Sequence, residues 1–268
     1  MKNTRDNTEE LCGACRNGNI EVVEEILSNK EVNINGRDCV CVGDTPLICP
    51  VRSGHLHIVR RILQHSEVEV NASDYAGYTP LMDAVNYGYL DIVRTLLEVP
   101  ALQLGKGDEY GSALHQACMH NRVSIMKLLC QDSRCSPGVV NKKNSYDGVT
   151  ALMMAVCFGL LDIVKELDRE GTDFFTKDRD GTTLIEMARG MNRAKVLEYL
   201  IKRNKVDSLK VIAGHNVVRY VKNKSDVEAL EIPGTVRQFL AGFVDDYEYH
   251  HTDDDDTDDD DADDTDND

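Results

Sequence analysis

DYAGYTPLMDAVNYGYLDIVRTLL, the sequence of residues 74–97, predicts a turn followed by two short helices. The hydroxyl of Thr79 can cap the first helix, and Pro80 fits its first position because no backbone donor is needed there. Gly88 ends this helix. The apolar residues from Ile92 to Leu97 stand at helical spacing and predict the second helix. One helical pair of this size cannot bury its apolar face alone, so further copies are expected.

The pattern recurs six times along the chain. An alanine of the first helix, replaced once by proline, marks each copy at intervals of 36, 34, 33, 38 and 33 residues. These markers are Ala14, Pro50, Ala84, Ala117, Ala155 and Ala188. Three residues earlier stands an aliphatic residue: Leu11, Leu47, Leu81, Leu114, Leu152 and Ile185. Four residues later stands glycine or asparagine, which adopt the left-handed conformation at least cost: Gly18, Gly54, Gly88, Asn121, Gly159 and Asn192. The six copies, called repeats one to six, predict an all-α solenoid.

The period of about 33 residues and the Thr-Pro-Leu of repeats two and three resemble ankyrin repeats. The resemblance covers roughly residues 8–202, and only His115 fills the histidine position that usually follows the leucine. Pro50 replaces the marker alanine, so we expect one helix hydrogen bond to be missing in repeat two. The resemblance implies a non-enzymatic solenoid that binds a protein target, and we assign residues 1–206 to this domain.

Aromatic side chains are concentrated in repeats three to five. In a stack of this kind the hairpin tips and the outer positions of the first helices line a concave face. Tyrosine suits the centre of an interface because it combines contact area, few rotamers and a hydroxyl. The alternative is that the tip tyrosines only pack on neighbouring tips. We predict that a partner binds Tyr75, Tyr78, Asn86, Tyr87, Tyr110, Met119, His120, Tyr146 and Phe158.

A different segment, residues 207–244, follows the repeats and resembles a SOCS box, which often follows ankyrin repeats. The resemblance implies that elongin C binds Leu209, Ala213 and Val217, and that Leu230, Ile232 and Pro233 help to select a cullin. Elongin B would complete the assembly, and the chain would be the substrate-recognition subunit of a ubiquitin ligase. Ala213 replaces the preferred cysteine, and Glu231 replaces the first proline of the family pattern. The alternative is a scaffold or inhibitor whose C-terminal helices only cap the solenoid.

The end of the chain is strongly acidic. Residues 245–268 hold 15 of the 47 acidic residues, so without them the net charge of −17 becomes −17 + 15 = −2. Self-repulsion predicts a disordered tail, and the charge disfavours nucleic-acid binding. No stretch approaches the ~18 apolar residues that span a bilayer, and the N-terminus has no apolar signal region. We therefore expect an intracellular protein, cytoplasmic or nuclear.

Nine cysteines raise the question of a metal site. Cys12-x-x-Cys15 together with Cys39-x-Cys41 allows a zinc site or simple packing. We favour packing, because the first pair lies one helical turn apart on a core face and the second forms no tight knuckle. No glycine-rich phosphate loop follows a strand, and no serine or cysteine stands in a nucleophile-elbow context. The expectation is a protein with no catalytic residue, no cofactor and no metal.

Overall fold

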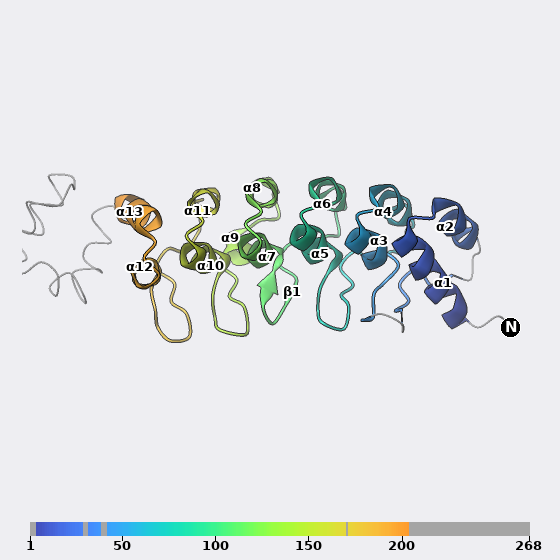
Figure 1. Ribbon diagram of the computed structural model, residues 1–268, viewed down its shortest axis with the longest axis horizontal. Helices are drawn as coiled ribbons and strands as arrows, with labels where there is room; N and C mark the ends of the chain where they lie inside the picture. The colour runs from blue at the N-terminus through green and yellow to red at the C-terminus, as the bar shows by residue number, and fades with distance from the viewer. Residues whose placement is uncertain (1–3, 29–31, 39–41, 170, 204–268) are drawn as a thin grey trace, which may run out of the picture. The chain divides into compact units, whose positions relative to one another are not determined.

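The computed structural model describes residues 4–28, 32–38, 42–169 and 171–203 (Figure 1). Contacts divide the chain into two compact units, residues 1–197 and 198–268. The predicted SOCS-like segment and acidic tail, residues 207–268, lie outside the described residues. The same holds for the residues assigned to elongin and cullin binding, namely Leu209, Ala213, Val217, Leu230, Ile232 and Pro233.

Helices follow one another in pairs, as predicted for an all-α repeat fold. The first helices of repeats one to six are α1 (Thr4–Asn17), α3 (Ile48–Ser53), α5 (Pro80–Tyr87), α7 (Ala113–Met119), α10 (Ala151–Phe158) and α12 (Leu184–Gly190). The second helices are α2 (Ile20–Leu27), α4 (Leu56–Leu63), α6 (Leu90–Leu97), α8 (Val123–Gln131), α11 (Leu161–Leu167) and α13 (Ala194–Arg203). Within residues 4–197 the first helices form one layer and the second helices another, with hairpin tips beyond the first layer (Figure 1). None of the described helices is long and apolar enough to cross a bilayer.

The aliphatic column three residues before the marker forms a buried seam. Leu47, Leu81 and Leu114 are each 2% exposed, and Leu152 is 1% exposed. The first helices pack in sequence, α1 on α3, α3 on α5, α5 on α7, α7 on α10 and α10 on α12. Each repeat thus buries apolar surface that an isolated pair would leave in water. In repeat six the corresponding Ile185 is half-buried.

The glycine and asparagine column ends each first helix in the left-handed conformation, as predicted. Gly88 has φ 82°, and its N–H bonds the carbonyl of Ala84 at 3.1 Å. Asn121 has φ 50° and Asn192 has φ 54°, and these are the non-glycine residues with positive φ in the described part of the chain. At the other end of α5 the hydroxyl of Thr79 accepts from Met82 N at 3.3 Å, the predicted N-cap.

Pro50 shortens the first helix of repeat two. α3 begins at Ile48, whereas α5 begins at Pro80, two residues earlier in the repeat. Cys49 N still donates to Thr45 O at 3.1 Å, but proline has no N–H for the next carbonyl. The late start of α3 agrees with the predicted loss of one helix bond.

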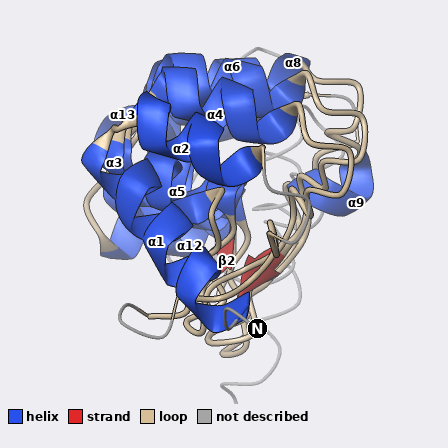
Figure 2. Cartoon of the chain, turned by 90° about the vertical axis from the view of Figure 1, so that its right-hand side faces the viewer, coloured by secondary structure: helices blue, strands red, loops and turns tan. Residues whose placement is uncertain are grey.

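The structure adds strand pairing at one of the expected hairpin tips and one further helix. A two-stranded hairpin forms the tip of repeat four, where β1 (Gly107–Asp108) pairs antiparallel with β2 (Gly111–Ser112). A Cβ on Gly107 would lie 1.9 Å from the carbonyl oxygen of Gly111, so only glycine fits there. The longest interval between markers, 38 residues from Ala117 to Ala155, holds a single helical turn after α8, namely α9 (Pro137–Val140). Seen along the row of repeats, α9 lies on the side where the connecting loops run (Figure 2).

Candidate protein-binding surface

We call the hairpin tips, together with the residues two and three positions after each marker, the tip face. The nine predicted partner residues belong to it. Six of them are large side chains with exposed fractions of 43–69%: Tyr75, Tyr87, Tyr110, Met119, Tyr146 and Phe158. His120 is also exposed, whereas Tyr78 and Asn86 are half-buried. The sequence columns therefore locate an exposed aromatic surface, although two of its predicted members face partly inward.

Neighbouring tips are bonded to one another. Tyr75 N donates to Val42 O at 2.9 Å, and Ser145 N donates to Glu109 O at 2.9 Å. The ring centroids of Tyr110 and Tyr146 lie 5.4 Å apart. The tip tyrosines thus pack on neighbouring tips, as one alternative required, and still expose much of their area. Packing of this kind restricts the motion of the rings.

Tyr78 and Asn86 make internal hydrogen bonds. The hydroxyl of Tyr78 accepts from Gln116 Nε2 at 3.4 Å, which links the tip of repeat three to α7. The backbone carbonyl of Asn86 accepts from Arg122 Nη2 at 2.8 Å. Both residues therefore connect repeats three and four, and neither side chain is fully exposed on the surface.

Arginine residues join each of the first two repeats to the tip of the next. Arg16, two residues after the first marker, lies 2.6 Å from the carboxylate of Asp38. Arg52, at the same position in repeat two, lies 2.7 Å from Asp74 and also contacts Asp83 and Asp44. These pairs were not predicted from the sequence. The signal was present, because an arginine two residues after the marker recurs in repeats one and two, and an aspartate recurs in the following tip.

Three carboxylates share the single guanidinium of Arg52. Asp44 and Asp83 are each 2% exposed, and Asp74 is 5% exposed. Burial raises the pKa of Asp83 to about 6 even though Arg52 lowers it, and burial also raises the pKa of Asp44. The three carboxylates therefore outnumber the one guanidinium that binds them.

Two histidines, His115 and His55, join neighbouring repeats. His115 Nδ1 accepts from Ser112 N at 3.1 Å, and its Nε2 lies 3.1 Å from Val149 O in the next repeat. His55 Nε2 lies 3.1 Å from Arg16 O. Burial lowers the pKa of His115, as expected for a neutral imidazole that joins two repeats.

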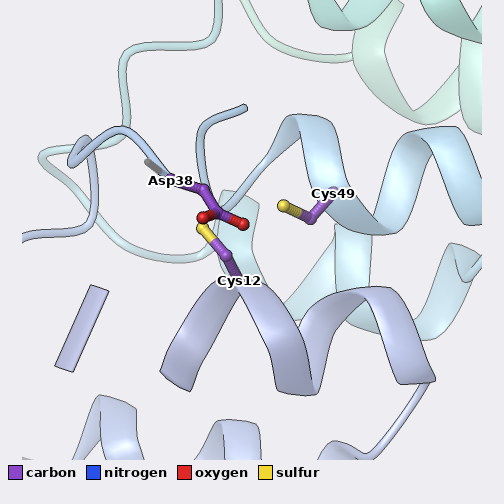
Figure 3. A group of neighbouring side chains, drawn as sticks. All are labelled: Cys12, Asp38 and Cys49. Carbon is purple, nitrogen blue, oxygen red and sulfur yellow. The ribbon is translucent and has the colours of Figure 1, made fainter. Parts of the chain in front are cut away.

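Cys12, Asp38 and Cys49 meet in the core between repeats one and two (Figure 3). Their potential ligand atoms lie within 4.8 Å of one another, whereas Cys39 and Cys41 lie outside the described residues. Arg16 Nη2 is 2.6 Å from the Asp38 carboxylate and 3.7 Å from the Cys49 sulfur. The hydrogen bond with Cys49 and burial raise the pKa of Cys12, which favours the thiol over the thiolate that a metal needs. A guanidinium beside the carboxylate repels a metal cation, so this arrangement suits packing.

Comparison with known proteins agrees with the repeat pattern and the stacked helical pairs. The family model described as "Ankyrin repeats (3 copies)" matches residues 11–108 and 114–213. The chain belongs to the ankyrin-repeat family. Ankyrin repeats are protein–protein interaction modules, and the fold is generally a non-enzymatic scaffold. This confirms the predicted fold class and the predicted general function.

Individual relatives share the repeats. The tyrosine-protein kinase HTK16 of Hydra vulgaris is 34% identical over 104 residues, which are 38% of this chain and 14% of the kinase. An ankyrin repeat domain from Acinetobacter baumannii has 28% identity and a TM-score of 0.63, with 71% of this chain and 95% of that domain covered. The ankyrin repeat protein EF0377 has 25% identity and a TM-score of 0.65, with 73% and 98% covered.

Proposed function

We propose that repeats three to five bind a protein target on the tip face. The observation that supports this proposal is the set of exposed aromatic and methionine side chains on that surface, Tyr75, Tyr87, Tyr110, Met119, Tyr146 and Phe158. Large exposed apolar areas on a folded protein mark interaction sites, and tyrosines dominate the binding energy of many interfaces. Tyr78, Asn86 and His120 would lie beside these anchors.

The test begins with the partner, which a crosslinking pull-down from the source cell would identify. Affinity for that purified partner is then measured by calorimetry with Tyr87→Ala, Tyr110→Ala and Phe158→Ala. Each substitution is expected to weaken binding by about 1 kcal/mol or more. Phe175→Ala is the matched control, because Phe175 is 56% exposed and lies in repeat six. Unchanged affinity in all three variants would show that the binding face lies elsewhere.

We further propose that the chain is divided into the repeat domain 1–206, a SOCS-like segment 207–244 and an acidic tail 245–268. Leu209, Ala213 and Val217 would recruit elongin C, and Leu230, Ile232 and Pro233 would contribute to the choice of cullin. The chain would then deliver its target to a ubiquitin ligase, in which the partners carry out the catalysis and the repeats supply proximity. Such a role would place the protein in the cytoplasm or nucleus. The support for this part is the sequence resemblance.

The alternative is an ankyrin scaffold or inhibitor in which residues 207–244 only cap the repeats. One observation favours it, because the family match continues to residue 213 and so includes Leu209 and Ala213. Co-expression with elongins B and C distinguishes the two functions. Recovery of both elongins with the wild type and with Lys210→Asp, but not with Leu209→Asp, would support the ligase receptor. Absence of elongin from every preparation would support the scaffold.

A further inference from the structure

The arginine that stands two residues after the marker in repeats one and two is absent from repeat three. The residue two positions after the marker is Arg16 in repeat one and Arg52 in repeat two, but Asn86 in repeat three. Asp108 opens the tip of repeat four, as Asp38 and Asp74 open the tips of repeats two and three. Asp38 and Asp74 each bind an arginine of the preceding repeat, Arg16 and Arg52 respectively. Asp108 has asparagine in place of that arginine.

Half of the Asp108 carboxylate has no partner. Its Oδ1 accepts from Tyr110 N and Gly111 N, both at 2.9 Å, and this bonding forms the turn. Its Oδ2 is buried and has no hydrogen-bond partner among the described residues. A Cβ on Gly77 would lie 2.8 Å from the Asp108 Cβ, so the aspartate packs directly on the tip of repeat three. A buried carboxylate oxygen in this state favours any donor that can reach it.

Gln116, which bonds Tyr78, supplies a second buried acceptor. Gln116 is fully buried in α7, and its Nε2 donates to the Tyr78 hydroxyl at 3.4 Å. Its Oε1 has no hydrogen-bond partner in the part of the chain that the structure describes. Burial raises the pKa of Tyr78, and the nearby carboxylates of Asp108 and Asp83 raise it further. The Tyr78 hydroxyl therefore stands among acceptors, and within the described residues the hydrogen bonds of these three side chains involve no cation.

We propose that Asp108, Gln116 and Tyr78 form a recognition site for a cationic side chain, most suitably arginine, of the protein target. An arginine fork carries donors enough to serve both a carboxylate and an amide oxygen. The partner's arginine would take the part that Arg16 and Arg52 play in the earlier repeats. The exposed ring of Tyr110, two residues after Asp108, offers an aromatic flank for the stem or the guanidinium. The site rests on the proposed function, because it assumes that a protein segment binds this face.

Charge identifies the occupant further. Besides Asp108, the carboxylates of Asp83 and Asp74 act on Tyr78, so an acidic segment would be repelled here. The acidic residues 245–268 of this chain are therefore unsuitable occupants. A basic segment of another protein is complementary to the surface.

The test uses the full-length chain and a library of random dodecapeptides displayed on phage. Wild type is expected to retain peptides enriched in arginine, with lysine second. Asp108→Asn keeps the turn-forming oxygen but loses the charge, so it should lose this enrichment. Asp178→Asn is the matched control, because Asp178 also opens a tip and accepts from Asp180 N and Thr182 N. Asn86→Arg supplies a guanidinium from within the chain and should also abolish the enrichment.

Fluorescence anisotropy with one selected arginine peptide then measures the pairing itself. Asp108→Asn should weaken binding about tenfold or more, and citrulline in place of the peptide arginine should weaken it similarly. The two losses should not add if the groups bind each other. Circular dichroism of each variant confirms that it is folded. The proposal is overturned if wild type retains no peptide, if retained peptides lack basic residues, or if Asp108→Asn binds as tightly as wild type. Retention of aromatic-dependent peptides without basic residues would overturn this site while leaving the proposed function intact.

Discussion

Arg52 Nη2 lies 2.7 Å from Asp74 Oδ2, although 22 residues separate the two side chains. The other oxygen of Asp74 accepts from Ala76 N at 2.9 Å and from Tyr78 N at 2.8 Å. One carboxylate thus forms the tip of repeat three and binds the first helix of repeat two. This bond fixes how the two repeats stack, because charge-assisted pairs of arginine with carboxylate are strong and directional.

Arg52→Met should destabilise the fold severely. The substitution leaves Asp44, Asp74 and Asp83 buried without a counter-charge, and removal of one partner of a buried ion pair costs about 3–5 kcal/mol. Urea unfolding followed by circular dichroism measures the loss. Arg61→Met is the control, because Arg61 pairs with the more exposed Glu24 and such pairs contribute about 0–1 kcal/mol. Equal effects of the two substitutions would show that the Arg52 network adds little.

The stability of the wild type should fall as the pH rises from about 4 to about 6. Burial raises the pKa of Asp83 from 3.8 to about 6, against the pull of Arg52 and with Asp74 and Asp44 beside it. The folded chain therefore holds this proton more tightly than the unfolded chain, and folding takes up a proton in that window. The expected loss is up to about 2–3 kcal/mol.

The Asp83 contribution is measured against Asp83→Asn, which does not titrate. Urea midpoints of both proteins are compared at several pH values between 4 and 7. The wild type should lose stability relative to the variant across the window, and Asp91→Asn, on the exposed side of α6, should follow the wild type. Parallel curves for wild type and Asp83→Asn would show that Asp83 titrates normally.

The repeat columns could be predicted from the sequence because they are set by local requirements. Leu81 and its equivalents recur where a helix must bury one face, and Gly88 recurs where the backbone must turn left-handed. The exposed positions of Tyr87 and Phe158 follow from the same columns. Each inference needs only the spacing within one repeat.

Contacts between repeats were harder to predict. The pair of Arg52 and Asp74 joins two repeats, so its signal lies between repeats: Arg16 and Asp38 have the same separation of 22 residues. The hairpin at Gly107 depends on the close approach of Gly111. The missed α9 did have a signal, since Ser136 followed by Pro137 is typical of a helix start. Asp108 stands out only once the arginine–aspartate pairs of the earlier repeats are known, because Asn86 takes the place of the arginine.

Asn71→Ala should weaken the junction between repeats two and three on the side of the connecting loops. Asn71 Nδ2 donates to Ala101 O at 2.7 Å, and its Oδ1 accepts from Gln103 N at 2.8 Å. Asn35 makes the same two bonds one repeat earlier. Loss of both bonds is expected to cost about 1–3 kcal/mol in urea unfolding. Asn17→Ala, at an exposed position of α1, is the control, and a cost no larger than in this variant would contradict the bridging role.

Asn86→Arg should stabilise the chain. Arginine at this position extends the column of Arg16 and Arg52 by one repeat and brings a guanidinium toward the unpartnered Oδ2 of Asp108. A new hydrogen bond to a buried charged group is expected to contribute about 1–3 kcal/mol, seen as a higher urea midpoint. Asn86→Gln lengthens the side chain without charge and should leave the midpoint nearly unchanged. If both variants unfold at the same urea concentration, position 86 does not face Asp108. Repeats three and four would then stack differently from repeats two and three, where Arg52 meets Asp74.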